Sequence, residues 1–222
     1  MFIEQNGTEL QRKLEYTIGH GQHQKTILIF LQDNLPSIAR KLREGAGTDL
    51  TNAIEDVITG EVVNLLNDKL RETSGYIFRF EAKSGPDILI FATPYRAFSG
   101  ELFVVEAKRL PSTSHRDYVK TGIGRFKSEE QGKQHDMAAI LGYVQSEDFA
   151  YWHKKVNSWI EDLISAKDKN IRWEQQDKIC MIQITDIVEY KSTHSRIKED
   201  AITLYHFWIM LSSVDIRLGD IQ

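Results

Sequence analysis

The sequence is poor in several features, and each shortage excludes a class of protein. It has a single cysteine, Cys180, so it forms no internal disulfide. None of its apolar runs approaches the ~20 residues that a membrane-spanning helix requires. Its first residues, MFIEQNGTEL, lack the basic and then apolar pattern of a signal peptide. These shortages predict a cytoplasmic protein without a membrane partner, and we expect Cys180 to be buried within the apolar run KICMIQI.

Positive charge is also scarce overall. The formal net charge is −4, which is not the charge of a protein that coats nucleic acid, so any contact with phosphates must be local. One basic segment runs from Lys108 to Lys133, where seven Lys or Arg residues accompany three acids. A second, shorter segment, residues 190–198, contains three basic residues and a histidine but no acid. Each segment is either a phosphate-binding surface or an ordinary solvated one.

The most informative stretch, residues 85–110, contains two short apolar strands joined by turn-forming residues. Asp87 lies at the start of the first strand, and Glu106 and Lys108 lie near the end of the second. Because side chains alternate along a strand, these two charged residues continue the face that holds Val104. Burying charges there is costly unless they are paired or hold a metal. Antiparallel pairing would bring Asp87 and Glu106 to one end of the hairpin, where two carboxylates beside an ammonium predict a magnesium site.

These residues resemble a known motif. Pro86-Asp87, followed at the end of the next strand by Glu106-Ala107-Lys108, is similar to the PD-(D/E)xK motif of the restriction-endonuclease-like nuclease superfamily. E-x-K triplets also occur at 81–83 and 189–191, but only the triplet at 106–108 lies a hairpin's length after the single Pro-Asp pair. The alternative interpretation is an edge strand whose charged residues face water.

The resemblance implies an α/β fold with a restriction-endonuclease-like αβββαβ core, in which helices flank a central mixed sheet. It also implies a Mg²⁺ ion, for which Mn²⁺ can substitute. The metal ligands that match the family pattern are Asp87, Glu106, the carbonyl of Ala107 and an acid from the helix before the sheet. For that acid we choose Glu61, which falls within an apolar stripe of the helix, with Glu55 as the second choice. Lys108 would orient the attacking water or stabilise the transition state, so the candidate catalytic residues are Asp87, Glu106, Lys108 and Glu61.

The activity that the resemblance implies is hydrolysis of phosphodiester bonds in nucleic acid. DNA is the expected substrate and RNA remains an alternative. Family members of this kind suggest a role in bacterial antiviral defence with a helicase or ATPase partner, and a homodimer is a further expected partner arrangement. The competing hypothesis is a catalytically silent subunit of the same fold that binds nucleic acid or assembles with a partner. The candidate nucleic-acid-binding residues are Arg109, Arg125, Lys127, Gln131, Gln134, His194 and Arg196.

The predicted elements divide the chain into an N-terminal helical appendage, residues 1–48, and a nuclease-like domain, residues 49–222. In the appendage, a polar lead-in precedes an amphipathic helix over 25–44, which Pro36 should kink or split. In the domain we expect helices at 49–72, 129–145 and 147–166, strands at 76–83, 178–190 and 201–213 besides the hairpin, and an extended or irregular segment at 117–126. Ser146 is the expected cap of the 147–166 helix, whose aromatic stripe should lie in the core.

Overall fold

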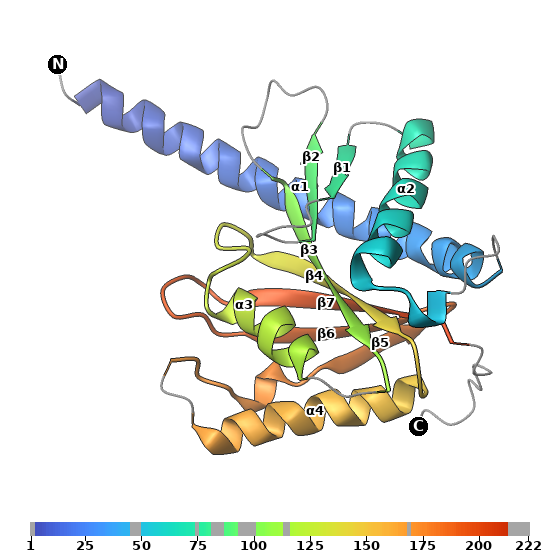
Figure 1. The fold of residues 1–222 in the computed structure, drawn as a ribbon. Coiled ribbons are helices and arrows are strands. Elements are labelled where there is room, and N and C mark those ends of the chain that lie inside the picture. The colour runs from blue at the N-terminus through green and yellow to red at the C-terminus, as the bar shows by residue number, and fades with distance from the viewer. Residues whose placement is uncertain are drawn as a thin grey trace.

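The computed structural model describes residues 3–44, 50–73, 76–80, 87–92, 101–112, 116–167 and 170–212. They form an α/β structure in which helices flank a seven-stranded mixed sheet (Figure 1). The strands are β1 (Tyr76–Phe80), β2 (Ile88–Ala92), β3 (Phe103–Leu110), β4 (Met137–Val144), β5 (Cys180–Ile184), β6 (Val188–His194) and β7 (Ile202–Met210). The helical elements are α1 (Ile3–Glu44), η1 (Leu50–Asn52), α2 (Glu55–Thr73), η2 (Tyr118–Ile123), α3 (Gly124–Lys127), α4 (Phe149–Ala166) and η3 (Gln175–Asp177).

The sheet has the strand order β1-β2-β3-β4-β7-β6-β5. β1, β2 and β3 pair antiparallel, and β4 then lies parallel to β3, reached through the crossover formed by η2 and α3. β7 is parallel to β4, and β6 and β5 complete the other edge as antiparallel strands. The predicted hairpin is confirmed, because Ile88 of β2 pairs with Val105 of β3. This register brings Asp87 next to Glu106.

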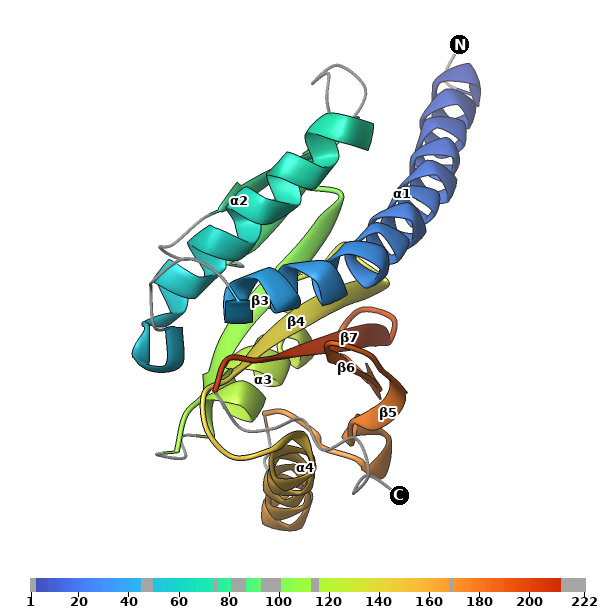
Figure 2. The ribbon, with the colours of Figure 1, turned by 90° about the vertical axis from the view of Figure 1, so that its right-hand side faces the viewer.

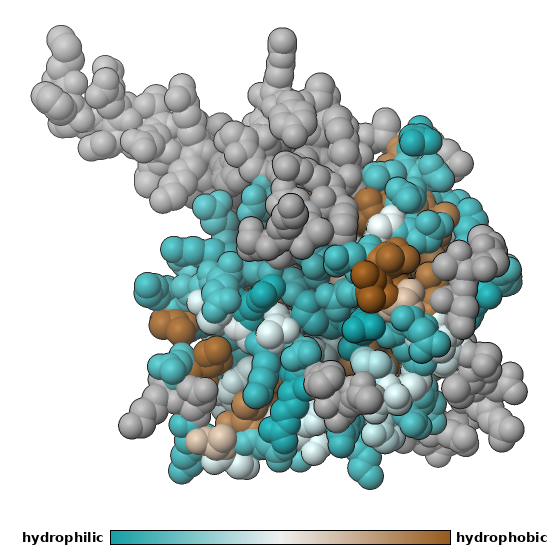
Figure 3. Space-filling model, in the orientation of Figure 1, coloured by the Kyte–Doolittle hydropathy of each residue, from teal (hydrophilic) through white to brown (hydrophobic). Residues whose placement is uncertain are grey.

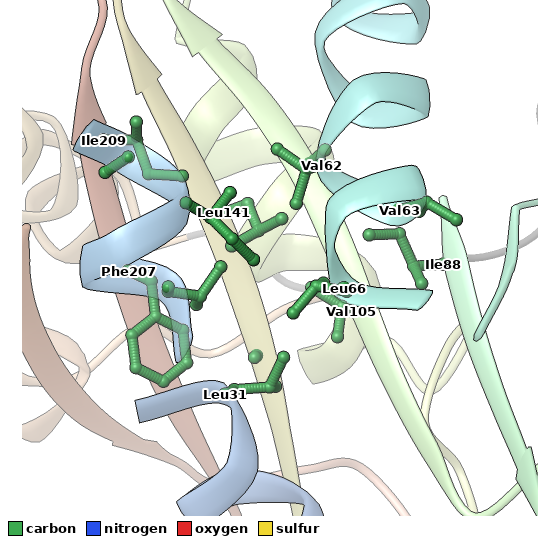
Figure 4. Packing of buried hydrophobic residues seen from close by; sticks show 14 of the residues in the cluster. Leu31, Val62, Val63, Leu66, Ile88, Val105, Leu141, Phe207 and Ile209 are labelled. Atoms are coloured by element: carbon green, nitrogen blue, oxygen red, sulfur yellow. The ribbon is translucent and has the colours of Figure 1, made fainter. Parts of the chain in front are cut away.

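The two faces of the sheet have separate hydrophobic cores. α1 and α2 cover one face, and η2, α3 and α4 cover the other (Figure 2). Strand alternation divides the side chains between them: Val105 and Leu141 pack toward α1 and α2, whereas Val104 and Ile140 pack toward η2 and α4. Figure 4 shows the first core, where Leu31 of α1 and residues of α2 meet the sheet. Glu106 and Lys108 therefore extend the face that η2 and α3 cover.

The N-terminal helix is longer than predicted. α1 begins at Ile3, within the segment expected to be a polar lead-in, and it continues through Pro36 to Glu44. The helix is curved but unbroken in Figure 2, although proline removes one backbone hydrogen bond. Its second half belongs to the core formed with α2 and the sheet, so it is part of the packed domain. Of the helices that the structure describes, α1 included, none is apolar over a length that would cross a membrane.

The prediction of a helix at 129–145 is wrong, because Met137–Val144 forms the central strand β4. The apolar spacing MAAILGYV fits a helical stripe, but every residue after Met137 in this strand is buried. A short apolar run buried on both faces of a sheet has no alternation to distinguish it from a buried helix. Gly142 is required here, since an added Cβ would lie 2.3 Å from a ring carbon of Trp208 on the neighbouring strand.

Four further predictions need correction. Residues 117–126 are helical, forming η2, a π-helix, and α3. The 147–166 helix is present as α4 with its tryptophans buried, but its cap is Asp148, whose side chain accepts the N–H of Tyr151 at 2.6 Å. The apolar run at 178–190 turns at 185–187 and forms two strands. Cys180 lies on the edge strand β5 and is exposed. The turn-forming residues that join the two strands of the predicted hairpin fall outside the described residues.

Candidate active site

Carboxylates from two different elements bind the edge of β3 where its pairing with β2 stops. That pairing reaches Val105, so the residues that follow have no described β2 partner. Asp87 Oδ2 accepts the backbone N–H of Ala107 at 2.6 Å, and Glu55 Oε2 accepts that of Arg109 at 3.0 Å. Because the two N–H groups are two residues apart, they point to the same side of the strand. The carboxylates thus take the place of a neighbouring strand.

The ammonium of Lys108 lies among three carboxylates. Its Nζ is 2.6 Å from Glu106 Oε1, 3.3 Å from Glu55 Oε1 and 3.7 Å from Asp87 Oδ2. It also donates to the carbonyl oxygen of Ala107 at 2.6 Å. The structure therefore brings Asp87, Glu106 and Lys108 together, as the motif spacing predicts.

A second cation borders this group. Arg125 of α3 places Nη1 3.4 Å from Glu106 Oε1, and its side chain is 40% exposed. The Glu106 side chain is fully buried, whereas those of Asp87 and Glu55 are 17% and 27% exposed. Three carboxylates thus share one ammonium and one guanidinium, which leaves a formal excess of negative charge at a site that opens to solvent.

Burial raises the pKa of each carboxyl group in the site. For Glu55, Asp87 and Glu106 the loss of solvation is the largest cause, and the nearby ammonium of Lys108 offsets only part of it. The pKa of Lys108 is also raised: burial acts to lower it, but the attraction of Glu106, Glu55 and Asp87 together outweighs that effect. Lys108 therefore remains a cation, and the carboxylates are held at a cost that a further cation would reduce.

Glu55, not Glu61, is the helix acid that reaches the site. Glu61 is exposed and takes no part in the ion pairs around Lys108. The stripe chosen from the sequence contains Ile54 and Val57, which are 58% and 49% exposed, and Figure 3 shows an apolar patch over the start of α2. The buried face instead contains Ile58, Val62 and Leu66. Glu55 precedes them by three, seven and eleven residues, so it shares their face.

Several candidate nucleic-acid-binding residues lie at or near the surface. Arg125 is partly exposed at the mouth of the site. Arg109 is partly exposed, and its guanidinium donates to the carbonyl oxygen of Ala53 at 3.4 Å. Gln134 is exposed. Arg196 is partly buried and donates to the carbonyl oxygen of Gly132 at 3.0 Å, so its guanidinium is already used in holding a loop.

Three candidates are buried, and their predicted role in binding nucleic acid needs correction. Lys127 is 1% exposed and His194 is 0% exposed. Both contact the buried carboxylate of Asp177, at 2.7 Å and 2.6 Å. Gln131 is 5% exposed and lies beside Glu106. Sequence position alone placed them in basic segments, but folding directs their side chains inward.

The donor set fits a hard divalent cation. In the described part of the chain no three carboxylate, imidazole or thiol groups are arranged so as to hold a metal ion directly, and the ammonium of Lys108 contacts all three carboxylates of the site. Glu106 Oε2, however, is buried and has no hydrogen-bond partner among the described residues. Carboxylate and carbonyl oxygens are the ligands that Mg²⁺ prefers. Asp87, Glu106, Glu55 and the carbonyl of Ala107 would hold such an ion.

Comparisons of the chain with protein-family models, with curated proteins and with solved structures find no match. Of the other E-x-K triplets, the one at 81–83 lies outside the described residues. In the triplet at 189–191, Glu189 is buried and accepts hydrogen bonds from Gln32 and Gln183, both at 2.7 Å. That acid is therefore a packed structural group on a different strand from the site.

Proposed function

We propose that the protein is a metal-dependent nuclease that hydrolyses phosphodiester bonds of nucleic acid. The observation that carries the proposal is the convergence of Asp87, Glu55 and Glu106 with Lys108 at the edge of β3. A buried carboxylate oxygen on Glu106 that has no hydrogen-bond partner among the described residues adds to it. Charged side chains that are buried together in this way are concentrated at functional sites.

The order of elements supports the same proposal. From α2 to β4 the chain forms a helix, three antiparallel strands, a helical crossover and a fourth strand parallel to the third. This is the αβββαβ order that the resemblance to the PD-(D/E)xK superfamily implies. Asp87 immediately precedes its second strand, and Glu106 and Lys108 lie within its third. We therefore propose a restriction-endonuclease-like core for this part of the chain.

The protein's own groups have distinct roles in this proposal. When bound, a Mg²⁺ or Mn²⁺ ion would acidify water and offset charge on the phosphate. Asp87, Glu106 and Glu55 would bind the ion, and backbone N–H groups of β3 already hold Asp87 and Glu55 in place. Burial acts to lower the pKa of Lys108, but in the metal-free site the attraction of Glu106, Glu55 and Asp87 raises it overall. As a cation, Lys108 would orient the attacking water or stabilise negative charge on the phosphate.

The substrate and partners follow from the same proposal. Arg125 and Arg109 lie closest to the site and would contact backbone phosphates, which provide affinity without sequence information. DNA is the proposed substrate. A role in bacterial antiviral defence with a helicase or ATPase partner, or as a homodimer, belongs to the same proposal, since the sequence shows no base-reading module of its own.

A specific observation favours the second candidate function, a catalytically silent subunit. Lys108 already contacts all three carboxylates, so each of them has a cationic partner in the protein without a metal ion. A silent subunit would keep these ion pairs as a structural feature while binding nucleic acid or a partner. The two candidates differ in whether a cation enters the site.

The deciding experiment combines cleavage with metal binding. Supercoiled plasmid, linear duplex, single-stranded DNA and RNA are incubated with wild type in Mg²⁺, Mn²⁺ or EDTA. Asp87→Asn is the test variant, and Asp68→Asn, at an exposed position of α2, is the control. We expect cleavage by wild type and Asp68→Asn that requires the cation, and none by Asp87→Asn. Absence of both cleavage and cation binding in wild type would favour the silent subunit.

A further inference from the structure

The segment that presents Arg125 to the site is short and has little stability of its own. α3 has four residues and follows a π-helix of six, and helices of this length are marginal without tertiary contacts. Yet Arg125 reaches Glu106 from α3, and Gly122 of η2 packs against the aliphatic part of Lys108. The position of residues 118–127 therefore determines where the guanidinium of Arg125 lies at the candidate active site.

The end of this segment is fixed by a buried ion pair. Lys127, the last residue of α3, places Nζ 2.7 Å from Asp177 Oδ1, and the two side chains are 1% and 0% exposed. A buried ion pair is often no more stable than an apolar pair of similar volume. Phe126, fully buried beside it, already supplies apolar packing. The ion pair is therefore better explained by its fixing the position of Lys127 than by a gain in the stability of the fold.

Asp177 is itself held rigidly. Its Oδ2 accepts the backbone N–H of Glu174 at 2.6 Å, within the cap of η3. Its Oδ1 lies 2.6 Å from His194 Nδ1 on β6. Because a carboxylate only accepts, His194 Nδ1 carries a proton. Burial lowers the pKa of His194 and so favours the neutral ring, in which Nε2 accepts from Ser192 Oγ, 2.6 Å away.

The same reasoning assigns the donor and acceptor of each hydrogen bond between Ser192 and Tyr118, at the start of the segment. Trp208 Nε1 can only donate, so Tyr118 Oη accepts from it at 2.7 Å. Tyr118 then donates to His206 Nδ1 at 2.8 Å, and His206 Nε2 donates to Ser192 Oγ at 2.7 Å. With Ser192 donating to His194, each donor has one acceptor. The buried chain runs from Trp208 through Tyr118, His206, Ser192, His194 and Asp177 to Lys127.

This chain contacts both ends of the segment that carries Arg125. Tyr118 is the first residue of η2, and Lys127 is the last of α3. We propose that this buried chain of hydrogen bonds acts as a clamp. It fixes residues 118–127 at both ends and so keeps the side chain of Arg125 next to Glu106. Tyr118, Lys127 and Asp177 are positioning residues that act through Arg125. The proposal rests on the proposed nuclease function for its kinetic readout.

The test is a double-mutant cycle measured as single-turnover cleavage. The paired variant Lys127→Met/Asp177→Asn removes both charges together and so leaves neither buried without its partner. We expect it to slow cleavage by about 10-fold to 100-fold, the effect of a small misplacement of a catalytic group. In an Arg125→Ala background the same pair should change the rate less than about twofold, since the group that it positions is absent.

A matched control separates positioning from general loss of an ion pair. Arg43→Met/Asp186→Asn makes the same change of charge at a partly exposed pair that joins α1 to the loop before β6, with 2.9 Å between Arg43 Nη2 and Asp186 Oδ1. It also removes the contact of Asp186 with Arg40. We expect wild-type cleavage from this control. If the paired Lys127/Asp177 variant fails to fold, Tyr118→Phe takes its place, since it removes only one hydroxyl. It should slow cleavage when Arg125 is present and have little effect in the Arg125→Ala background.

Chemical rescue gives a second measurement. Lys127 lines an open pocket of about 330 Å³ together with Ser195 and Glu174, so a small amine can approach the space that Lys127→Ala would create. We expect propylammonium to restore cleavage in a saturable manner and propanol at the same concentration to have no effect. Rescue by both, or by neither, would contradict a role for the ammonium.

Hydrogen exchange tests the clamp without any activity. In the paired variant the amides of residues 118–127 should exchange at least about tenfold faster, while those of β4 should not change. Unchanged exchange, or rate losses that multiply in the Arg125→Ala background, would overturn the proposal. Failure of the nuclease function has a different signature, because wild type itself would then show no cleavage while the exchange result still reports on the clamp.

Discussion

The carboxylate of Glu55 accepts the backbone N–H of Arg109 across 3.0 Å, although the two residues lie on α2 and β3. The other oxygen of Glu55 is 3.3 Å from the ammonium of Lys108. One side chain therefore joins the helix, the backbone of β3 beyond its pairing with β2, and the cation of the candidate active site. A glutamine keeps the oxygen that accepts from Arg109 but lacks the charge, so the two roles can be separated.

Replacing that acid is the first test of the site. In a metal-dependent nuclease, Glu55→Gln should weaken Mn²⁺ binding or slow cleavage by about 10-fold to 100-fold, the range expected for a group that tunes a metal site. Glu61→Gln, at an exposed position on the same helix, is the matched control and should behave as wild type. Calorimetric Mn²⁺ titration and cleavage assays provide the measurements. A larger loss of Mn²⁺ binding or cleavage in Glu61→Gln than in Glu55→Gln would contradict this assignment and favour Glu61, the acid chosen from the sequence.

The site was predictable from sequence where two local constraints agreed. Antiparallel pairing of two strands close together in the sequence predicts that Asp87 and Glu106 lie at one end of the hairpin, and the β2–β3 register agrees with it. The acid on α2 could not be chosen in this way, because the apolar stripe of this helix has an acid near each side. Which side is buried depends on how the helix packs against the sheet. Glu55 repeats the spacing of Ile58 and Val62, so a signal for it was present in the sequence.

The remaining errors have physical causes in tertiary packing. β4 is buried on both faces, so its apolar residues carry no period of two. Lys127 and His194 lie in basic segments of the sequence, yet Asp177, distant from Lys127 along the chain, draws both into the interior. Partnerships between buried charges depend on which strands lie side by side. Composition and spacing carry no information about that.

The buried acid of the motif gives a second prediction. Burial raises the pKa of Glu106, so Glu106→Gln should leave the melting temperature of the metal-free protein unchanged or higher while abolishing cleavage. Mn²⁺ should stabilise wild type against heat but not this variant, because a ligand that binds only the native state raises its stability.

The control for this prediction is Glu189→Gln, which changes an equally buried acid in a different E-x-K triplet. It should keep both cleavage and the thermal shift by Mn²⁺, whatever its effect on stability. A Glu106→Gln protein that melts far below wild type would show that the Glu106 carboxylate is structural.

Acidification gives a third prediction, which concerns the buried histidines. Burial lowers the pKa of His206 well below its usual value, so the unfolded chain binds a proton that the folded chain does not. Stability should therefore be fully present above a pH of about 6.5 and fall as the pH drops below it, by about 1.4 kcal/mol per pH unit for one such group. Urea unfolding of wild type and His206→Gln between pH 7.5 and 5.5 measures this slope.

The slope should be smaller in His206→Gln. The raised pKa values of the site carboxyl groups act in the opposite direction, because a folded state that holds protons more tightly gains stability as the pH falls. Repeating both titrations in a Glu106→Gln background reduces that contribution. An equal slope with and without His206 would show that this histidine is already charged when folded.

Lys108 provides the prediction that distinguishes a catalytic cation from a structural one. Its ammonium contacts Glu106, Glu55 and Asp87, so Lys108→Ala leaves three carboxylates close together and should destabilise the metal-free protein. Saturating Mg²⁺ should restore stability, since the ion replaces the lost charge. If Lys108 also stabilises charge on the phosphate, single-turnover cleavage should remain slower by roughly 10²-fold after stability is restored. Lys108→Arg should restore little, because a planar guanidinium does not replace a compact ammonium. A Lys108→Ala enzyme that cleaves bound substrate at the wild-type rate in saturating Mg²⁺ would limit this lysine to holding the carboxylates until the metal binds.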